Sequence, residues 1–391
     1  MAVDFNLKTN NFQGQPAEST PVKTKKPAET EKSSGMEKIN NFFLRFSRIP
    51  IKEKLFFVQY LNIMLKSGIS LAAGLETLAK QTDNKRFAKI IKNVSASVEK
   101  GVSFTESLKP HQDVFGELFI SMIEAGELSG KLEDVLGQLY IQLKKRHELN
   151  SKVKGALTYP AVIVFAMGGI GIFMMIMVVP KMIDMLQSFG AELPLPTKIL
   201  IAVSSGIVNN GLFVGVAVVV FILGFVQALR TYRGKYIFQA ILLKTPIISP
   251  IIKKINLAHF SRTISSLLKT DIMIIKTFEI TANVLGNLHY RKAVIEMSER
   301  IQKGSQINEV VIAYPKLFPP VVNQIISVGE QTGELDSILS ELAGFYEGEV
   351  DKIMDNLPSI IEPLLILFLG VGVGAMAVAV IMPMYTLTSA V

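Results

Sequence analysis

The residue types that most often perform chemistry are few and scattered in this 391-residue chain. It contains no cysteine, which excludes disulfides, thiolate metal sites and a cysteine nucleophile. The four histidines are His111, His147, His259 and His289. No two of them are three or four residues apart, so they do not provide the paired ligands of a helical metal site. We therefore expect no cofactor.

Acidic side chains gather in one place, between Glu341 and Asp355. Paired carboxylates can act as acid and base, but a charged run on a helix is more often a solvated face, and we favour that interpretation. The chain has no Gly-x-x-x-x-Gly-Lys-Ser/Thr phosphate loop and no nucleophile elbow. The sequence therefore predicts a protein that is not an enzyme.

The most distinctive motif is Gly-Glu-x-(Ser/Thr)-Gly-x-Leu, which occurs twice, at residues 126–132 and 329–335. In the structural interpretation, Gly126, Gly130, Gly329 and Gly333 form turns between helices, and the hydroxyl of Ser129 or Thr332 caps free backbone N–H groups. In the functional interpretation, Glu127 and Glu330 contact a basic surface of a partner. We favour the turn and keep the two glutamates as candidate partner contacts.

The repeated motif belongs to a longer internal repeat with a constant offset of 203 residues. The matched pairs include Leu65 with Leu268, Glu76 with Glu279, Ala79 with Ala282, Gly101 with Gly304, Phe115 with Phe318, Pro160 with Pro363, and Pro180 with Pro383. Because the matches need no net gap, they indicate duplication of one unit, a helical domain followed by a membrane span.

Three uncharged, apolar runs are long enough to cross a bilayer, which requires about 20 residues. We place the spans at residues 155–180, 207–229 and 363–386, with Pro160 and Pro363 near span ends, where a missing N–H is best tolerated. The mean hydropathy of +0.38 fits such a protein. The fold class predicted is an all-α membrane protein with two repeated helical-bundle domains, at 50–154 and 230–357, and three transmembrane helices.

Lysine and arginine positions predict the orientation, because they favour the cytoplasmic side. They gather before the first span (Lys144, Lys145, Arg146, Lys152, Lys154) and after the second (Arg230, Arg233, Lys235, Lys244, Lys253, Lys254). Both domains are therefore expected in the cytoplasm and the short loop 181–198 outside. The third span has an acidic approach, so its direction follows only from alternation, which places the C-terminus outside. The net charge of +8 is attributed to these cytoplasmic segments rather than to nucleic-acid binding.

Helical patterns fill the predicted domains. Leu71, Leu75, Leu78 and Ala79 form an apolar helical stripe, and Ser103 with Glu106 fits a capping box. Residues 1–36 are rich in Pro, Thr, Lys and Glu, and we predict a disordered cytoplasmic tail there.

Together these features resemble the GspF/PilC family of inner-membrane platform proteins, over residues 50 to 391. The resemblance rests on the repeat, the two Gly-Glu motifs and the three spans. It also rests on Lys-Val-Lys-Gly-Ala-Leu-Thr-Tyr-Pro at 152–160, Val-Val-Pro at 178–180, and Glu362-Pro363. Ser67-Gly68-Ile69 fits as well, whereas Asp271 replaces the corresponding glycine in the second repeat, so we expect that turn to differ.

The resemblance implies a platform of a type IV pilus or type II secretion machine in the bacterial inner membrane. Implied partners are a cytoplasmic secretion ATPase, inner-membrane assembly proteins, pilin or pseudopilin subunits, the lipid bilayer and further copies of the chain. The alternative is a membrane adaptor or a subunit of a transporter complex. Whether the machine builds a pilus, secretes protein or takes up DNA stays open.

Overall fold

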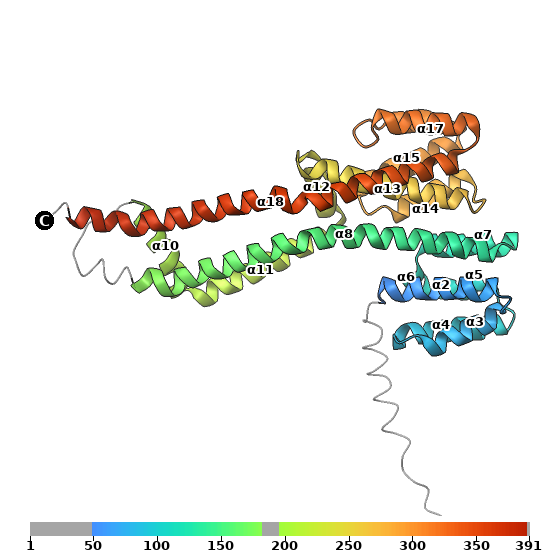
Figure 1. Cartoon of the computed structure of the whole chain (residues 1–391), viewed down its shortest axis with the longest axis horizontal. Coiled ribbons are helices and arrows are strands. Elements are labelled where there is room, and N and C mark those ends of the chain that lie inside the picture. The colour runs from blue at the N-terminus through green and yellow to red at the C-terminus, as the bar shows by residue number, and fades with distance from the viewer. Residues whose placement is uncertain (1–48, 182–194, 389–391) are drawn as a thin grey trace, which may run out of the picture. The chain divides into compact units, whose positions relative to one another are not determined.

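A computed structural model describes residues 49–181 and 195–388, and these residues are almost entirely helical, with no strand among them (Figure 1). The all-α prediction is therefore confirmed. The predicted tail 1–36 and most of the predicted loop 181–198 lie outside the described residues.

The first domain is built from short helices that lead into one long helix. They are α2 (Ile51–Lys66), α3 (Leu71–Gln81), α4 (Lys85–Glu99), α5 (Phe104–Leu108), a 3-10 turn (Lys109–His111), α6 (Gln112–Phe115), α7 (Glu117–Ser129) and the long α8 (Leu132–Phe173). Ser103 accepts a hydrogen bond from the Glu106 N–H (3.2 Å), which is one half of the predicted capping box. The Glu106 carboxylate contacts Lys109 instead of completing the box.

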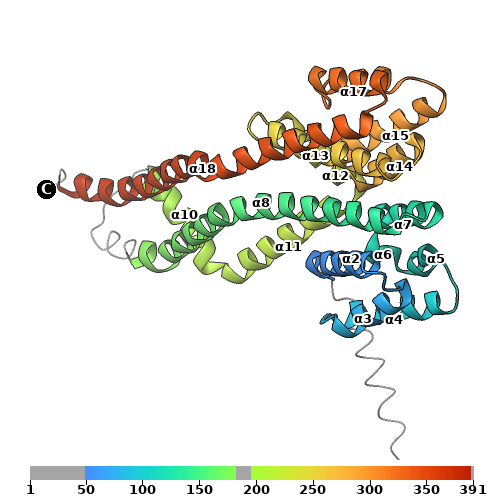
Figure 2. The ribbon, with the colours of Figure 1, turned by 45° about the vertical axis from the view of Figure 1, so that its right-hand side comes forward.

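The second domain repeats this order after the middle of the chain. A π-helical segment (Met174–Val178) follows α8, and then come α10 (Leu195–Asn209) and α11 (Gly211–Arg230). The domain consists of α12 (Tyr232–Lys244), α13 (Ile248–Leu268), α14 (Ile274–Val284), α15 (Leu288–Gln302), α16 (Ile307–Ile312), α17 (Pro320–Thr332) and the start of α18 (Leu335–Thr388). Figure 2 shows α18 and α8 as the two longest helices of the described chain.

Each domain has an aromatic cluster at the same positions of the repeat. In the first, the rings of Phe57, Phe87 and Phe115 lie 5.6 to 5.9 Å apart, and all three are buried. The residues 203 positions later are Phe260, Tyr290 and Phe318, with ring centroids 5.0 Å (260–318) and 5.4 Å (290–318) apart. Such pairs add packing energy beyond the area that they bury. The duplication therefore extends from the sequence into the cores.

The two domains also pack against each other, which the sequence does not reveal. Leu267 and Ile280 of the second domain lie in the core of the first, and Leu149 of α8 lies in the core of the second. The buried Gln142 of α8 joins α13 at both ends of its amide, donating to Thr263 (3.1 Å) and accepting from Ser266 (3.1 Å). Because all polar atoms in this contact are paired, the domains are held in one arrangement.

Three described helices are long and apolar enough to span a membrane, as predicted. They lie within Leu132–Lys181, Gly211–Arg230 and Leu335–Val378. The helices α12 and α13 also pass this test as a pair, but they are bent by 111°. Since Phe260 and Ile264 of α13 are fully buried in the second core, we assign α13 to the domain and not to a span.

The boundaries of the loop and of the second span differ from the prediction. Residues 195–198 are not loop but the first turn of α10, and residues 207–209 are its end, so the second spanning helix begins at Gly211. A polar residue of α10 makes a contact that joins this helix to the π-helical segment. Ser204 is buried and donates to the Met175 carbonyl (2.6 Å) in the π-helical segment. Widened turns leave backbone groups that need such partners inside an apolar region.

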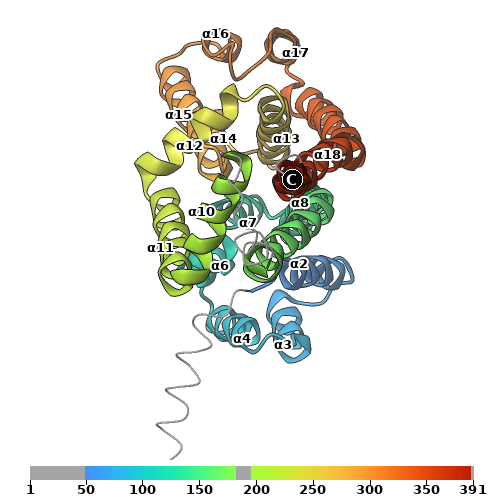
Figure 3. The same ribbon diagram turned by 90° about the vertical axis from the view of Figure 1, so that its left-hand side faces the viewer.

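Two of the prolines predicted near span ends lie in the long helices α8 and α18, which Figures 1 and 3 show. Pro160 lies inside α8 and Pro363 inside α18, because each helix continues without a break from its domain into the apolar segment. The predicted division into a domain ending at residue 154 and a separate span is therefore a division within one helix.

Candidate functional site: the two glycine–glutamate turns

The first Gly-Glu motif connects α7 to α8. Gly130 ends α7 in the left-handed conformation (φ +69°), which favours glycine over any residue with a Cβ atom. Gly126 serves a different purpose, because a Cβ atom there would lie 2.9 Å from the Cβ of Val135. The two glycines thus allow the chain to turn sharply and the two helices to pack closely.

Glu127 caps a neighbouring helix. Its carboxylate accepts hydrogen bonds from the N–H groups of Phe104 (2.6 Å) and Thr105 (3.0 Å) and from the Thr105 hydroxyl (2.7 Å). Burial acts to raise the pKa of Glu127, but the hydrogen bonds from Thr105 and Phe104 together outweigh it, so the pKa lies below its usual value. The free N–H groups at the start of α5 therefore have an anionic partner from α7.

The second motif reproduces this geometry. Gly333 ends α17 with φ +74°, and a Cβ atom on Gly329 would lie 3.1 Å from the Leu335 Cα. Glu330 accepts from the N–H groups of Ile307 (2.7 Å) and Asn308 (3.1 Å) at the start of α16. In both repeats the glutamate lies 23 residues after the first residue whose N–H it caps.

The hydroxyl residue of each motif has a role different from the predicted one. Ser129 donates to the Ala125 carbonyl (2.7 Å) and Thr332 to the Val328 carbonyl (3.0 Å). They satisfy carbonyls of the ending helix and do not cap N–H groups of the next one. The N–H capping that we predicted for the hydroxyls is performed by the glutamates, and on a different helix.

The partner-contact interpretation of Glu127 and Glu330 stays a prediction. Both residues are half-buried, and in both the two carboxylate oxygens already accept hydrogen bonds from their own chain. A basic partner would compete with these bonds. The geometry thus gives each glutamate an intramolecular role as a helix cap. The sequence did not predict this role, because the capped helix begins 23 residues earlier in the chain.

Asp271 corrects another expectation. Its φ is +60°, against +79° for Gly68 in the first repeat, so the turn is the same although the residue differs. In both turns the residue that follows donates its N–H back to the helix: Ile69 to Met64 (3.0 Å) and Ile272 to Leu267 (3.2 Å). Aspartate tolerates this conformation better than most residues, which explains the substitution.

In the acidic cluster before the third span, Glu347, Glu349 and Asp351 are ion-paired, whereas Glu341 and Asp355 are exposed as on a solvated face. Glu347 accepts two hydrogen bonds of 2.8 Å from Arg262 of α13, and the side chains are only 15% and 14% exposed. Glu349 pairs with Lys254 (2.9 Å), and Asp351 pairs with Lys152 of α8 (2.7 Å). Among the described residues, no three His, Asp or Glu side chains are grouped as metal ligands would be.

These pairs reflect a divergence between the repeats. At the offset of 203, three of the basic positions of α8 match acidic positions of α18: Lys144 with Glu347, Arg146 with Glu349, and Lys152 with Asp355. The two helices contact each other (Figures 1 and 2), and the pair of Lys152 with Asp351 joins them. Duplicated helices of equal charge would repel there, whereas these attract.

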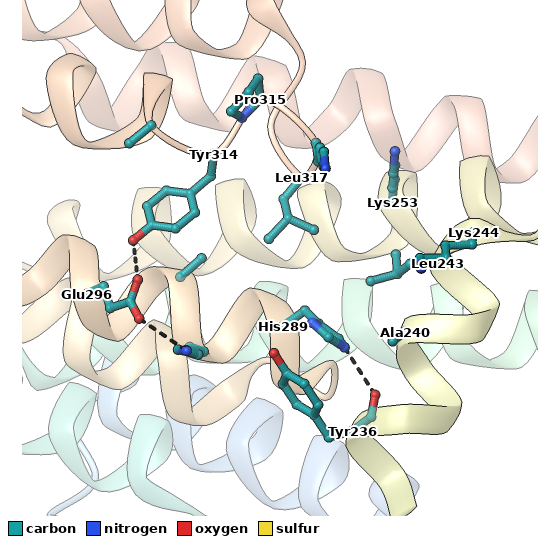
Figure 4. Close-up of a pocket in the computed structure, with 14 residues that line it drawn as sticks. Tyr236, Ala240, Leu243, Lys244, Lys253, His289, Glu296, Tyr314, Pro315 and Leu317 are labelled. Atoms are coloured by element: carbon teal, nitrogen blue, oxygen red, sulfur yellow. Dashed lines mark hydrogen bonds and ion pairs between the residues drawn. The ribbon is translucent and has the colours of Figure 1, made fainter. Parts of the chain in front are cut away.

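A cavity in the second domain is a further feature that sequence reasoning missed. It lies between α12, α13, α15 and the loop that precedes α17, and its volume is about 580 Å³ (Figure 4). Tyr236 of α12 stacks near His289 of α15, with ring centroids 4.0 Å apart, and the His289 Nε2 is 3.1 Å from the Tyr236 carbonyl oxygen. Its residues are separated by up to 81 positions in the sequence, from Tyr236 to Leu317, so no local motif marks it.

The fold and the turns define a class of protein, a helical membrane protein in which a helical domain leads twice into a spanning helix. The family model described as "Type II secretion system (T2SS), protein F" matches the chain twice, at residues 57–180 and 260–383. The two matches begin 203 residues apart, since 260 − 57 = 203, which is the offset of the repeat. The chain belongs to this family.

Curated relatives extend the comparison over most of the chain. The type IV pilus assembly protein PilC of Thermus thermophilus is 34% identical over 86% of this chain and 82% of the relative. PilC of Myxococcus xanthus is 32% identical over 88% of this chain and 83% of its own length. The type II secretion system protein F of Aeromonas hydrophila is 28% identical over 95% of both chains. The family thus includes proteins of both machines.

Proposed function

We propose that this chain is the non-enzymatic inner-membrane platform of a type IV pilus or type II secretion machine. In this role it couples a cytoplasmic secretion ATPase to the assembly of pilin or pseudopilin subunits. The observation that carries the proposal is the family match on both repeats, each of which includes a helical domain and the spanning helix that continues from it. Inner-membrane assembly proteins and further copies of the chain are the other proposed partners.

The proposed topology places both domains in the cytoplasm. Its support is the lysines and arginines that precede the first span and follow the second. In this topology the N-terminus is cytoplasmic, the segment between the first two spans is outside, and the C-terminus is periplasmic. The acidic residues before the third span do not oppose it, because Glu347, Glu349 and Asp351 are paired with cations of the same chain.

The test combines a phenotype with a binding measurement. A strain that lacks the gene is expected to lose filament assembly or secretion and to recover it with the wild-type chain. The tagged chain in mild detergent is expected to capture the purified secretion ATPase of the same organism, while an unrelated three-span protein does not. Normal filaments and secretion in the deletion strain, together with no capture, would contradict the proposal. Lost solute uptake with intact filaments and secretion would favour the alternative of a transporter subunit.

The non-enzymatic part is tested separately. The purified chain, freed of co-purifying ATPase, is expected to release no phosphate from ATP. Stoichiometric turnover that survives further purification would overturn this part of the proposal.

A further inference from the structure

The cavity between α12, α13 and α15 has a strongly basic lining. Four lysines line it, Lys244, Lys253, Lys292 and Lys316, against one carboxylate, Glu296 (Figure 4). Four positive charges and one negative charge leave a net +3 around a space of about 580 Å³. Such a lining favours an anion by simple electrostatics.

The Glu296 carboxylate already has partners in the chain, whereas three of the lysines have no carboxylate partner among the described residues and can bind an anion. Glu296 pairs with Lys292 (3.7 Å) and accepts from the Tyr314 hydroxyl. Burial, with the hydrogen bond to Glu296, raises the pKa of Tyr314 to about 12, so this hydroxyl stays protonated and keeps donating. In the part of the chain that the structure describes, no ion pair joins Lys244, Lys253 or Lys316 to a carboxylate. Lys253 is half-buried, whereas Lys244 and Lys316 are exposed.

The remaining walls of the cavity are apolar. Ala240 and Leu243 of α12 and Leu317 of the opposite loop line it beside the lysines. Lysines bind phosphate as point charges, and the apolar walls suit a molecule that also carries a hydrophobic part. The combination fits an anionic amphiphile better than a fully solvated ion.

The position of α12 supplies a second, independent observation. It begins at Tyr232, directly after the spanning helix α11 ends at Arg230, so this side of the cavity adjoins the end of a span. Ile237 and Ile241, one turn apart on α12, are 60% and 58% exposed. A helix with exposed aliphatic residues and basic neighbours at the end of a span is typical of one that lies in the membrane interface.

We propose that this cavity binds the phosphate group of an anionic phospholipid. The three available lysines contact the phosphate, the apolar wall accommodates the glycerol and the first methylenes, and α12 rests in the headgroup region on Ile237 and Ile241. A soluble phosphate compound would use the same lysines but gains nothing from the exposed isoleucines, which is why the lipid is favoured. This proposal is independent of the role in a pilus or secretion machine.

The experiment uses the full chain in a neutral detergent. Phosphatidylglycerol, phosphatidylcholine and glycerol 3-phosphate are titrated separately, and binding is followed by native mass spectrometry and by the shift in melting temperature. The test variant is the triple substitution Lys244→Gln, Lys253→Gln, Lys316→Gln. The control, Lys52→Gln, Lys92→Gln, Lys100→Gln, removes the same charge from exposed positions in the first domain.

Phosphatidylglycerol is expected to bind wild type and control alike and the triple variant about ten- to a hundredfold more weakly. Phosphatidylcholine and glycerol 3-phosphate are expected to bind none of them measurably. Equal phosphatidylglycerol affinity for the triple variant and wild type would overturn the site. Glycerol 3-phosphate binding as tightly as the lipid, and lost in the triple variant, would overturn the lipid as its ligand. If the triple variant does not fold, Lys253→Gln alone must weaken lipid binding, and an unchanged affinity there overturns the proposal equally.

Discussion

Glu127 and Glu330 show how one residue type can connect three helices. Each lies in the last turn of one helix, caps the start of another, and precedes the turn into a third. The first glycine of the motif permits the close contact and the second the turn, so every fixed position has its own physical task. Because the tasks differ, substitutions at these positions are expected to have different consequences.

At the turn glycines, the sign of the stability change on substitution by alanine tests the turn geometry. Gly130→Ala and Gly333→Ala place a Cβ atom at positive φ, and each is expected to destabilise the chain by about 1 kcal/mol. Gly348→Ala is the control, because this glycine lies in α18 with open space around it, and alanine there is expected to stabilise by about 0.5–1 kcal/mol. Thermal melting in detergent measures all three. A gain in stability at position 130 or 333 would contradict the turn geometry.

The motif glutamates are expected to act mainly through stability. Glu127→Ala and Glu330→Ala leave two backbone N–H groups without their partner, and each is expected to cost about 1–2 kcal/mol. Glu127→Gln keeps one acceptor oxygen and is expected to cost less. Melting and capture of the secretion ATPase are measured together. Unchanged melting with weakened capture would favour partner contact, whereas lowered melting with unchanged capture would remove these residues as partner contacts.

His259 predicts a dependence of stability on pH. Burial, together with the charge of Arg146, lowers the pKa of His259 to about 4, whereas an unperturbed imidazole has a pKa of about 6.5. Between these values the unfolded chain binds a proton that the folded chain does not. The contribution of His259 to the free energy of unfolding is therefore fully present above pH 6.5. It is lost as the pH falls towards 4, by about 1 kcal/mol per pH unit. Melting curves from pH 7 to 4 are expected to show a shallower decline for His259→Gln than for wild type. Equal declines would exclude this residue as the cause.

At the scale of the helices, periodic sequence patterns predicted the duplication and the spans. They did not predict the contacts between helices that are far apart in the sequence. The offset of 203 and the apolar runs predicted the duplication and the three spans, because both are properties of the chain read in order. The same offset could also have found the aromatic clusters, since Phe57 and Phe87 match Phe260 and Tyr290. The capping role of Glu127, the ion pairs of Glu347 and the contact of α10 with the π-helical segment could not be predicted, because their partners come from distant helices.

The pairing of α13 with α18 predicts a large effect from a single arginine. Arg262→Ala leaves the half-buried Glu347 without its two-bond partner and is expected to destabilise by about 2–3 kcal/mol. Adding Glu347→Ala is expected to recover part of this loss, because it removes a carboxylate whose remaining cation, Lys145, is 4.0 Å away. Lys80→Ala, which breaks an ion pair whose two side chains are 73% and 56% exposed, is the control and is expected to have almost no effect. Equal melting of the Arg262 and Lys80 variants would show that the first pair is no stronger than a surface contact.

For the whole molecule, the central prediction is the topology. The chain has no cysteine, so single cysteines at Ser188 and Ser305 report their own side of the membrane. With an impermeant thiol reagent on cells whose outer membrane is permeabilised, we expect labelling at position 188 and none at 305. After lysis both should react, which checks that each thiol is accessible. Labelling at 305 in unlysed cells would reverse the proposed orientation of the second domain.

The unbroken course of α18 has a mechanical consequence. Its 54 residues, at about 1.5 Å each, give a rod of about 80 Å, of which a bilayer core occupies only about 30 Å. Since α8 is likewise continuous and is joined to α18 by Lys152 and Asp351, each domain continues as one helix into its apolar segment, with Pro160 and Pro363 as places where a backbone hydrogen bond is missing. We therefore expect a displacement of either domain to pass along these helices into the membrane, and we expect each helix to bend most easily at its internal prolines.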